Sequence, residues 1–178
     1  MGQVTEIKGY SNSEIGERER KYLTFTLAGE DYGIEILQVK EIIGMMPITS
    51  VPRTPTFFKG VINLRGKVIP VVDLRLRFGM EEKEYTPQTC IVVVEANKNG
   101  VTETIGVVVD SVSEVVNIKT EETEEAPSFS GMVDTEFISA MAKTDGGVKI
   151  LLDINKVLGV KEGESLRSSE MRILEGDA

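Results

Sequence analysis

Three aspartates stand where carboxylate chemistry could be built. Asp73 and Asp153 each follow a five-residue stretch that holds four or five apolar residues, and each precedes a short helical turn. Asp110 follows a run of valines. A converged carboxylate pair can act as general acid and base, and an enzyme of this kind would need one carboxyl group with a raised pKa. The alternative is that Asp73 and Asp153 are helix N-caps, with Gly79 and Gly159 ending the same turns. Their repetition in two similar segments favours capping over catalysis.

The composition excludes most other side-chain catalysis. The 178 residues include no histidine, so no Ser-His-Asp triad, Cys-His pair or imidazole–zinc site can form from them. Cys90 is the only cysteine, which excludes an internal disulfide and a multi-thiolate metal cluster. The glutamate clusters at 81–84 and 121–125 lack the ligand spacing and the glycine of a calcium loop. Much common enzyme chemistry is therefore absent, and we expect no cofactor and no metal site.

A glycine-rich segment at 60–67 (GVINLRGK) invites comparison with a phosphate-binding loop. Five residues separate its glycines instead of four, and Val68 stands where a magnesium-binding Ser or Thr is required. The segment also lies between two predicted strands. We interpret residues 63–66 as a tight turn that joins those strands.

Charge and hydropathy limit the partners. Asp and Glu outnumber Lys and Arg by 29 to 20, for a net charge of −9, so a nucleic-acid partner is not expected. The first 22 residues are polar and lack the apolar core of a signal peptide. The longest apolar runs have about five residues, far short of the ~20 that span a bilayer. We expect a cytoplasmic protein without direct membrane insertion.

The rest of the sequence is typical of a β-barrel or β-sandwich. Short segments rich in Val and Ile alternate with Gly, Pro, Asn and Asp about every 8–12 residues. The predicted strands cover residues 22–27, 32–36, 42–45, 60–64, 67–72, 90–96, 102–109, 113–117, 140–143 and 148–152. Single helical turns are predicted at 37–40, 74–78 and 154–158. Residues 1–20 are predicted to be a flexible arm, 120–127 a solvated acidic loop and 161–178 a polar tail.

The central sequence contains an internal repeat. Residues 66–79 match 146–159 in kind at an offset of 80, and residues 32–43 match 105–116 at an offset of 73. The difference of seven residues falls in the acidic loop, where an insertion is well tolerated. We infer two similar β modules in tandem, at 21–85 and 86–160.

One turn of the first module has a continuous apolar face. Ile36, Val39 and Ile42 recur at a spacing of three to four residues, and the default interpretation is that they form core. If the modules meet edge to edge, this face becomes one wall of a groove, with Arg65 as a polar anchor on its rim. The opposite wall would be formed by the matching face of the second module, Val109, Val112 and Val115.

Several sequence blocks carry a more specific likeness. They are residues 22–25 (YLTF) with 32–34 (YGI), 39–42 (VKEI), 54–66 (TPTFFKGVINLRG), 68–75 (VIPVVDLR) and 106–112 (GVVVDSV). Together they resemble the CheW family of chemotaxis coupling proteins, and the resemblance runs from about residue 20 to 160. It implies a mainly β fold of two intertwined five-stranded barrels, each like an SH3 barrel, and no catalysis.

The resemblance also implies partners and contact surfaces. Members of this family link membrane chemoreceptors to the histidine kinase CheA, whose regulatory domain has the same fold. The cytoplasmic hairpin tip of a receptor is expected in the groove between the modules. On this sequence the groove would be formed by Leu23, Ile36, Val39, Ile42, Val109 and Val112, with Arg65 at its edge.

The kinase contacts implied by the resemblance lie at opposite ends of the protein. Ile48, Val51 and Pro52 would contact the kinase from the first module, and Phe129 from the second. Glu124 occupies a place that is often basic in the family, so the polar part of the second contact differs here. A free-standing SH3-like barrel module that binds another helical or peptide partner is the alternative function.

Overall fold

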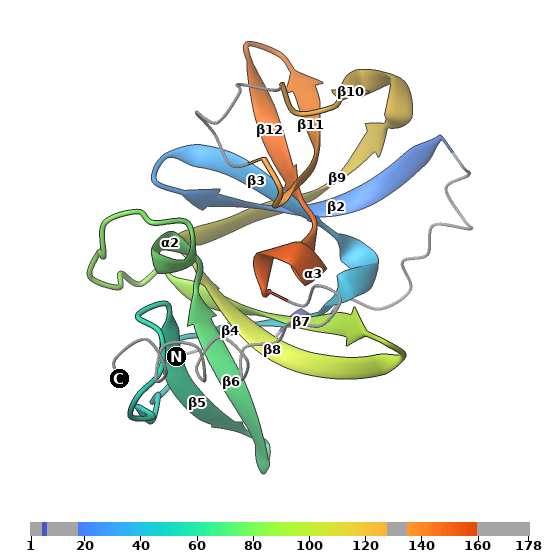
Figure 1. Cartoon of the computed structure of the whole chain (residues 1–178). Helices are drawn as coiled ribbons and strands as arrows, with labels where there is room; N and C mark the ends of the chain where they lie inside the picture. The colour runs from blue at the N-terminus through green and yellow to red at the C-terminus, as the bar shows by residue number, and fades with distance from the viewer. Residues whose placement is uncertain (1–4, 7–17, 128–134, 160–178) are drawn as a thin grey trace, which may run out of the picture.

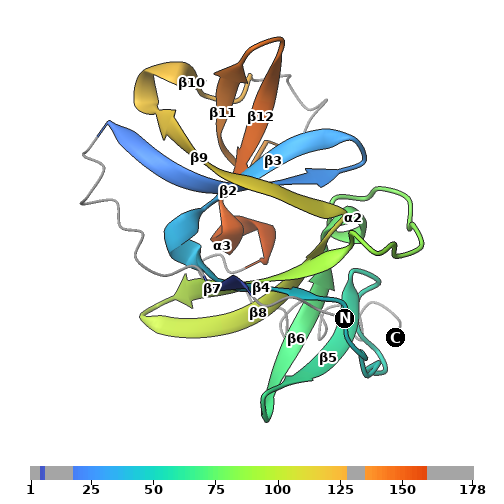
Figure 2. The ribbon, with the colours of Figure 1, turned by 180° about the vertical axis from the view of Figure 1, so that it is seen from behind.

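The computed structural model describes residues 5–6, 18–127 and 135–159, and it folds them into two six-stranded sheets (Figures 1 and 2). Sheet A contains, in spatial order, β1 (Thr5–Glu6), β4 (Val39–Gly44), β7 (Cys90–Lys98), β8 (Val101–Val109), β6 (Lys67–Asp73) and β5 (Phe58–Leu64). Sheet B contains, in spatial order, β10 (Thr123–Glu124), β11 (Ile138–Thr144), β12 (Gly147–Leu152), β3 (Glu30–Glu35), β2 (Glu19–Leu27) and β9 (Ser111–Lys119). The mainly β fold class predicted from the sequence is confirmed.

All ten predicted strands are present, and the predicted helical turns correspond to η1 (Ile36–Gln38), α2 (Leu74–Arg77) and α3 (Ile154–Val157). The prediction of a plain acidic loop at 120–127 is wrong in part. This stretch begins with the 3₁₀ turn η2 (Thr120–Glu122) and continues as β10, although its glutamates are exposed as expected. Within the predicted N-terminal arm, β1 pairs with β4, and β2 already begins at Glu19.

The two sheets are equivalent strand by strand. In sheet A the order β4-β7-β8-β6-β5 matches β9-β2-β3-β12-β11 in sheet B, with the same parallel and antiparallel pairings. The β2–β3 hairpin from the first half of the sequence pairs with strands of the second half, and the β7–β8 hairpin does the reverse. The boundary predicted between 85 and 86 therefore separates the two sequence repeats but not the two sheets, because each sheet takes strands from both halves.

The residues of the β5–β6 turn explain its geometry. Arg65 and Gly66 both have positive φ, 51° and 86°, as a two-residue type I′ hairpin turn requires. The Asn63 side chain accepts a hydrogen bond from the Gly66 N–H at 2.8 Å. Residues 63–66 are thus a tight turn between strands, as predicted, and not a phosphate loop.

Apolar side chains form three clusters. The largest lies between the sheets and includes Phe25 and Ile34 from sheet B together with Val92 and Val107 from sheet A. Smaller clusters fill the other side of each sheet, around Ile91 in sheet A and around Leu151 in sheet B. The shared cluster, together with α2 and α3 at the junction (Figure 1), joins the two sheets into one body.

Both one-turn helices have the predicted caps. The Asp73 carboxylate accepts a hydrogen bond from the Leu76 N–H at 3.3 Å, and the Asp153 carboxylate accepts from the N–H groups of Asn155 and Lys156. Gly79 and Gly159 have φ of 75° and 72° just after the helices.

Candidate functional site

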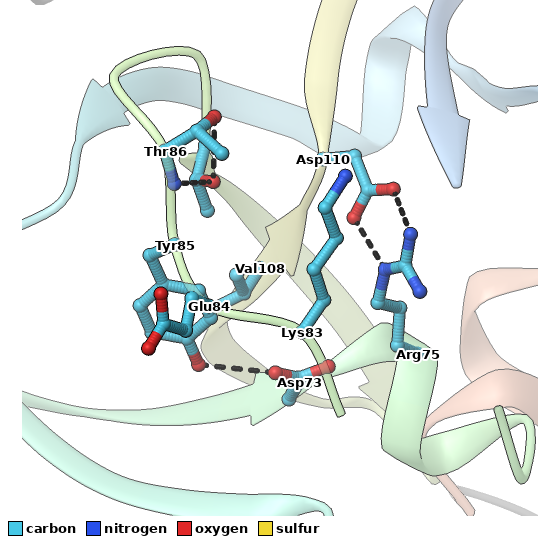
Figure 3. A pocket seen from close by; sticks show the side chains of 9 residues that line it. Asp73, Arg75, Lys83, Glu84, Tyr85, Thr86, Val108 and Asp110 are labelled. Atoms are coloured by element: carbon cyan, nitrogen blue, oxygen red, sulfur yellow. Dashed lines mark hydrogen bonds and ion pairs between the residues drawn. The ribbon is translucent and has the colours of Figure 1, made fainter. Parts of the chain in front are cut away.

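The carboxylates considered for catalysis have structural partners. Asp73 and Asp110 line one small pocket of about 30 Å³, room for about one water molecule (Figure 3). The Asp110 carboxylate accepts two hydrogen bonds from the Arg75 guanidinium, at 2.7 and 2.6 Å, and a third from the Ala28 N–H at 2.9 Å. The Tyr85 hydroxyl donates to Asp73 at 3.0 Å. Both carboxylates are therefore engaged by side chains of the same pocket.

Electrostatics in this pocket oppose acid catalysis. The hydrogen bonds from Arg75 lower the pKa of Asp110, which keeps its carboxylate ionised. Burial, and then the negative charge of Asp73, raise the pKa of the Tyr85 phenol, which keeps its proton. The enzyme hypothesis required a carboxyl group with a raised pKa, and Asp110 is shifted the other way.

The six apolar residues predicted for the receptor groove do come together. Leu23, Ile36, Val39 and Val109 belong to the shared cluster between the sheets, and each is no more than 5% exposed. Ile42 and Val112 are half-buried and pack against the same cluster. The core interpretation therefore applies to the first four, whose side chains offer almost no surface, and only Ile42 and Val112 reach the exterior.

Arg65 lies at the exposed tip of the β5–β6 hairpin and forms an ion pair with Glu41 of β4. The Glu41 side chain is only 11% exposed, and its Oε1 atom has no hydrogen-bond partner. Both residues line an open hollow of about 210 Å³, whose rim also carries Lys40 and Lys67. Sequence reasoning singled out Arg65 but missed Glu41. The available signal was an acidic residue directly before two isoleucines in β4.

The predicted kinase contacts of the first module follow β4. Ile48 is half-buried against the sheet A cluster, whereas Val51 and Pro52 are exposed. The Thr54 hydroxyl donates to the Val51 carbonyl at 3.0 Å and steadies this segment. Phe129 lies outside the described residues.

Sequence reasoning also missed the junction at α2. The Arg77 guanidinium lies over two aromatic rings, 5.0 Å from the centre of Phe57 and 4.6 Å from that of Phe137. Its Nε donates to the Val157 carbonyl of α3 at 2.7 Å. The two phenylalanines are repeat equivalents at the offset of 80, so Arg77 joins the two halves of the sequence at equivalent points.

Residues 5–6, 18–127 and 135–159 hold neither a candidate metal site nor a membrane-spanning helix. These residues contain no group of three or more Cys, Asp or Glu side chains placed to hold a metal ion. Nor do they include a helix with the length and apolar character needed to cross a membrane.

The fold defines the class of the protein as two interlocked SH3-like barrels that share one core. Comparison with known proteins gives the family. Residues 21–162 match the family model described as "CheW-like domain", and the chain belongs to this family.

Similar proteins cover most of the chain. It is 37% identical to the chemotaxis protein CheW of Klebsiella aerogenes, over 91% of this chain and 93% of that protein. It is 34% identical to the chemotaxis protein CheW of Bacillus subtilis, over 82% of this chain and 90% of the relative. The crystal structure of the scaffolding protein TtCheW from Thermoanaerobacter tengcongensis superposes with a TM-score of 0.70 and 37% identity, covering 80% of this chain and 94% of that one. The resemblance seen in the sequence is confirmed.

Proposed function

We propose that this protein is a non-enzymatic scaffold that couples membrane chemoreceptors to the histidine kinase CheA in chemotaxis. The observation that carries the proposal is the match to the CheW-like domain over residues 21–162, together with similarity to chemotaxis proteins along most of their length. The protein would act in the cytoplasm, at the membrane arrays of its receptors.

The receptor hairpin would dock over Ile42 and Val112, beside Arg65. These two apolar side chains are half-buried and rest on the shared cluster, so a partner helix could cover them without opening the core. Leu23, Ile36, Val39 and Val109 would support this surface from beneath. Arg65 would supply charge at the rim, where charge selects and orients a partner more than it adds affinity.

The regulatory domain of the kinase would contact two other places. In the first module, exposed Val51 and Pro52, with Ile48 anchored in the sheet A cluster, form a small apolar surface. In the second module we assign the contact to Phe129. An aromatic side chain in an acidic loop is typical of a contact residue when it does not pack inward.

The absence of catalysis is part of this proposal. It is supported by the roles of the three candidate carboxylates. Asp73 and Asp153 cap one-turn helices, and Asp110 is bound by Arg75.

The receptor contact is tested by charge changes at two equivalent turns. Arg65→Glu should weaken binding of a receptor cytoplasmic hairpin, whereas Asp145→Lys, at the matching turn of sheet B, should leave it unchanged. Because Arg65→Glu also places a second carboxylate beside Glu41, Arg65→Gln serves as a variant that removes only the charge. Unchanged receptor binding by folded Arg65→Glu and Arg65→Gln proteins would contradict this contact.

The second kinase contact is tested by Phe129→Ala. We expect receptor binding near normal and reduced recruitment into mixed assemblies with the kinase. Melting temperature is measured in parallel. A large drop in melting temperature with kinase assembly intact would mean that Phe129 is an ordinary core residue and that the contact lies elsewhere.

A further inference from the structure

The equivalence of the two sheets breaks down at one edge. In sheet A, the outer edge of β4 is covered by β1, with Thr5 opposite Ile42 and Glu6 opposite Glu41. In sheet B, the equivalent strand β9 ends the sheet and pairs, within the described part of the chain, only with β2. At the repeat offset of 73, Glu41 and Ile42 correspond to Glu114 and Val115. One edge is therefore covered at the place where its counterpart is open.

The open edge has the same local geometry as the covered one. Both strands carry a bulge at equivalent positions, at Lys40 in the β4–β7 ladder and around Ser113 in the β9–β2 ladder. The Glu114 N–H donates to the Thr24 hydroxyl at 3.2 Å, and that hydroxyl donates to the Glu114 carbonyl at 2.8 Å. The Glu114 backbone therefore faces β2.

The neighbouring backbone groups must face outward. Along an extended strand, the N–H and C=O groups of successive residues point to opposite sides. Since those of Glu114 point toward β2, those of Val115 and Asn117 point to the free edge. A row of such groups is a template for another strand, and β9 has nine residues without Pro or Gly.

The surroundings of this edge favour a basic partner segment. Beside Val116 and Ile118 of β9 lies an open hollow of about 560 Å³, whose rim carries Glu121, Glu122 and Asp145. Two lysines also line the hollow, but each is engaged with an acidic residue. Lys143 pairs with Glu124, and Lys149 with Asp31, both at 3.2 Å. Glu122 accepts a hydrogen bond from the Lys119 N–H at 2.8 Å, but no ion pair in the described part of the chain neutralises its charge, so all three rim carboxylates can attract a cation.

We propose that the β9 edge at Val115–Asn117 is a docking site for an extended segment of another protein, added as an antiparallel strand. The segment carries an apolar side chain over Val116 and Ile118 and a basic side chain toward Glu121 and Glu122. Main-chain hydrogen bonds give such strand addition its affinity, and side chains give it specificity. The site lies on the same strand as Val112 of the proposed receptor contact, but it uses the outward backbone groups farther along β9 and does not depend on the receptor or kinase contacts.

The chain supplies its own probe, because residues 2–9 contain the strand that covers β4. Two synthetic peptides are titrated into the full-length isotope-labelled protein, GQVTEIKG and its Glu6→Lys form GQVTKIKG. Amide NMR shifts and slowed hydrogen exchange are expected at Val115 and Asn117. Binding of the basic peptide should be the tighter of the two and should weaken in high salt. A third peptide, N-methylated on alternate residues, should bind about tenfold more weakly or not at all.

Two variants separate the backbone from the side chain. Asn117→Pro removes an outward N–H without removing a bond to β2 and should weaken peptide binding about tenfold. Asn117→Ser keeps that N–H and serves as the matched control, with binding unchanged. Should Asn117→Pro lower the melting temperature strongly, the N-methylated peptide still tests the same bond on the unaltered protein.

Four results would overturn the proposal. The first is that the β9 amide signals do not shift up to millimolar peptide, and the second is that peptide binds Asn117→Pro and Asn117→Ser proteins equally well. The third is that only β4 amide signals shift. The fourth is that β9 amide signals shift with protein concentration and not with added peptide. The third would mean displacement of β1, and the last would identify a second copy as the occupant. None of these measurements involves receptor or kinase, so their failure leaves the proposed scaffold function untouched.

Discussion

The hairpins β5–β6 and β11–β12 have the same place in their sheets and very different surfaces. Each pairs in antiparallel register through a short turn, and each carries a bulge near its start, between Phe58 and Gly60 or between Ile138 and Ala140. The first presents Arg65 at its tip, paired to Glu41, and the second presents Asp145 beside an acidic hollow. The two repeats thus share a backbone while their exposed side chains differ in charge, which gives one fold two hairpin surfaces of different character.

The helices that follow these hairpins differ in the same way. The shared cluster takes up Ile154 and Val157 of α3 and its C-cap residue Leu158, all fully buried. In α2 only Leu74 is buried to that degree, and the helix crosses to its neighbours through Arg75 and Arg77. The α2 junction therefore adds charged hydrogen bonds to the apolar packing of Leu74 and of the C-cap residue Phe78, whereas α3 is held mainly by apolar packing.

The largest difference between the hairpins is expected at the bulge. Gly60 has φ of 139°, and a Cβ there would lie 2.0 Å from the Thr49 carbonyl oxygen, whereas its repeat equivalent is already Ala140. Gly60→Ala should lower the free energy of unfolding by about 3 kcal/mol or more, because backbone must move. Ala140→Gly should cost only about 0.5–1 kcal/mol. Chemical denaturation measures both changes in the free energy of unfolding. Equal losses for the two variants would show that the backbone is equally constrained at both bulges.

The charged junction should be sensitive to acid. Hydrogen bonding from Arg75 depresses the folded-state pKa of Asp110. The stability it provides is thus complete above the unfolded value of about 3.9 and is lost as pH falls through the lower folded value. Asp110→Asn should lower the free energy of unfolding by about 2 kcal/mol at pH 7. Below about pH 4 the difference in free energy of unfolding between this variant and the unaltered protein should disappear. Leu37 is the repeat equivalent of Asp110, and Leu37→Asn is the control without acid dependence. A gap for Asp110→Asn that persists unchanged to pH 2 would refute the ion-pair explanation.

The two helix caps should differ by a smaller amount. Asp73 is buried and accepts from both the Leu76 N–H and the Tyr85 hydroxyl, whereas Asp153 is half-buried and accepts from backbone alone. Asp73→Ala should lower the free energy of unfolding by about 2 kcal/mol, and Asp153→Ala by about 1 kcal/mol. Thermal unfolding checks the order. A measurable catalytic turnover that either variant removed would restore the enzyme hypothesis.

Local patterns in the sequence were sufficient to predict the strands and the capped helices. Alternating Val and Ile segments, Asp before an apolar turn and Gly after it act within a few residues, and the structure has each of them. The exchange of hairpins between the sheets could not be predicted in the same way, because it depends on which distant edges pair. The apolar spacing of Ile36 and Val39 likewise could not separate a groove wall from a core, and the structure buries both.

Most of the polar network was beyond sequence reasoning for a related reason. Arg75 and Asp110 are 35 residues apart, and Arg77 reaches Val157 across 80 residues. Partners so far apart in the sequence share no periodicity, so only the fold shows that they meet. Arg65 was predictable as a turn residue, but its pairing with Glu41 across the hollow was not.

The central claim, that this protein joins receptor to kinase, is tested most directly by reconstitution. Receptor cytoplasmic fragments arrayed on vesicles, the kinase CheA and this protein are mixed, and the kinase that sediments with the vesicles is measured with and without the protein. The scaffold account predicts that the amount of kinase in the sediment rises in proportion to the added protein. Arg65→Glu and Phe129→Ala should each reduce this amount. Arg65→Glu should do so by weakening receptor binding, whereas Phe129→Ala should leave receptor binding intact. Kinase recruitment that is the same with and without the unaltered protein would contradict the account.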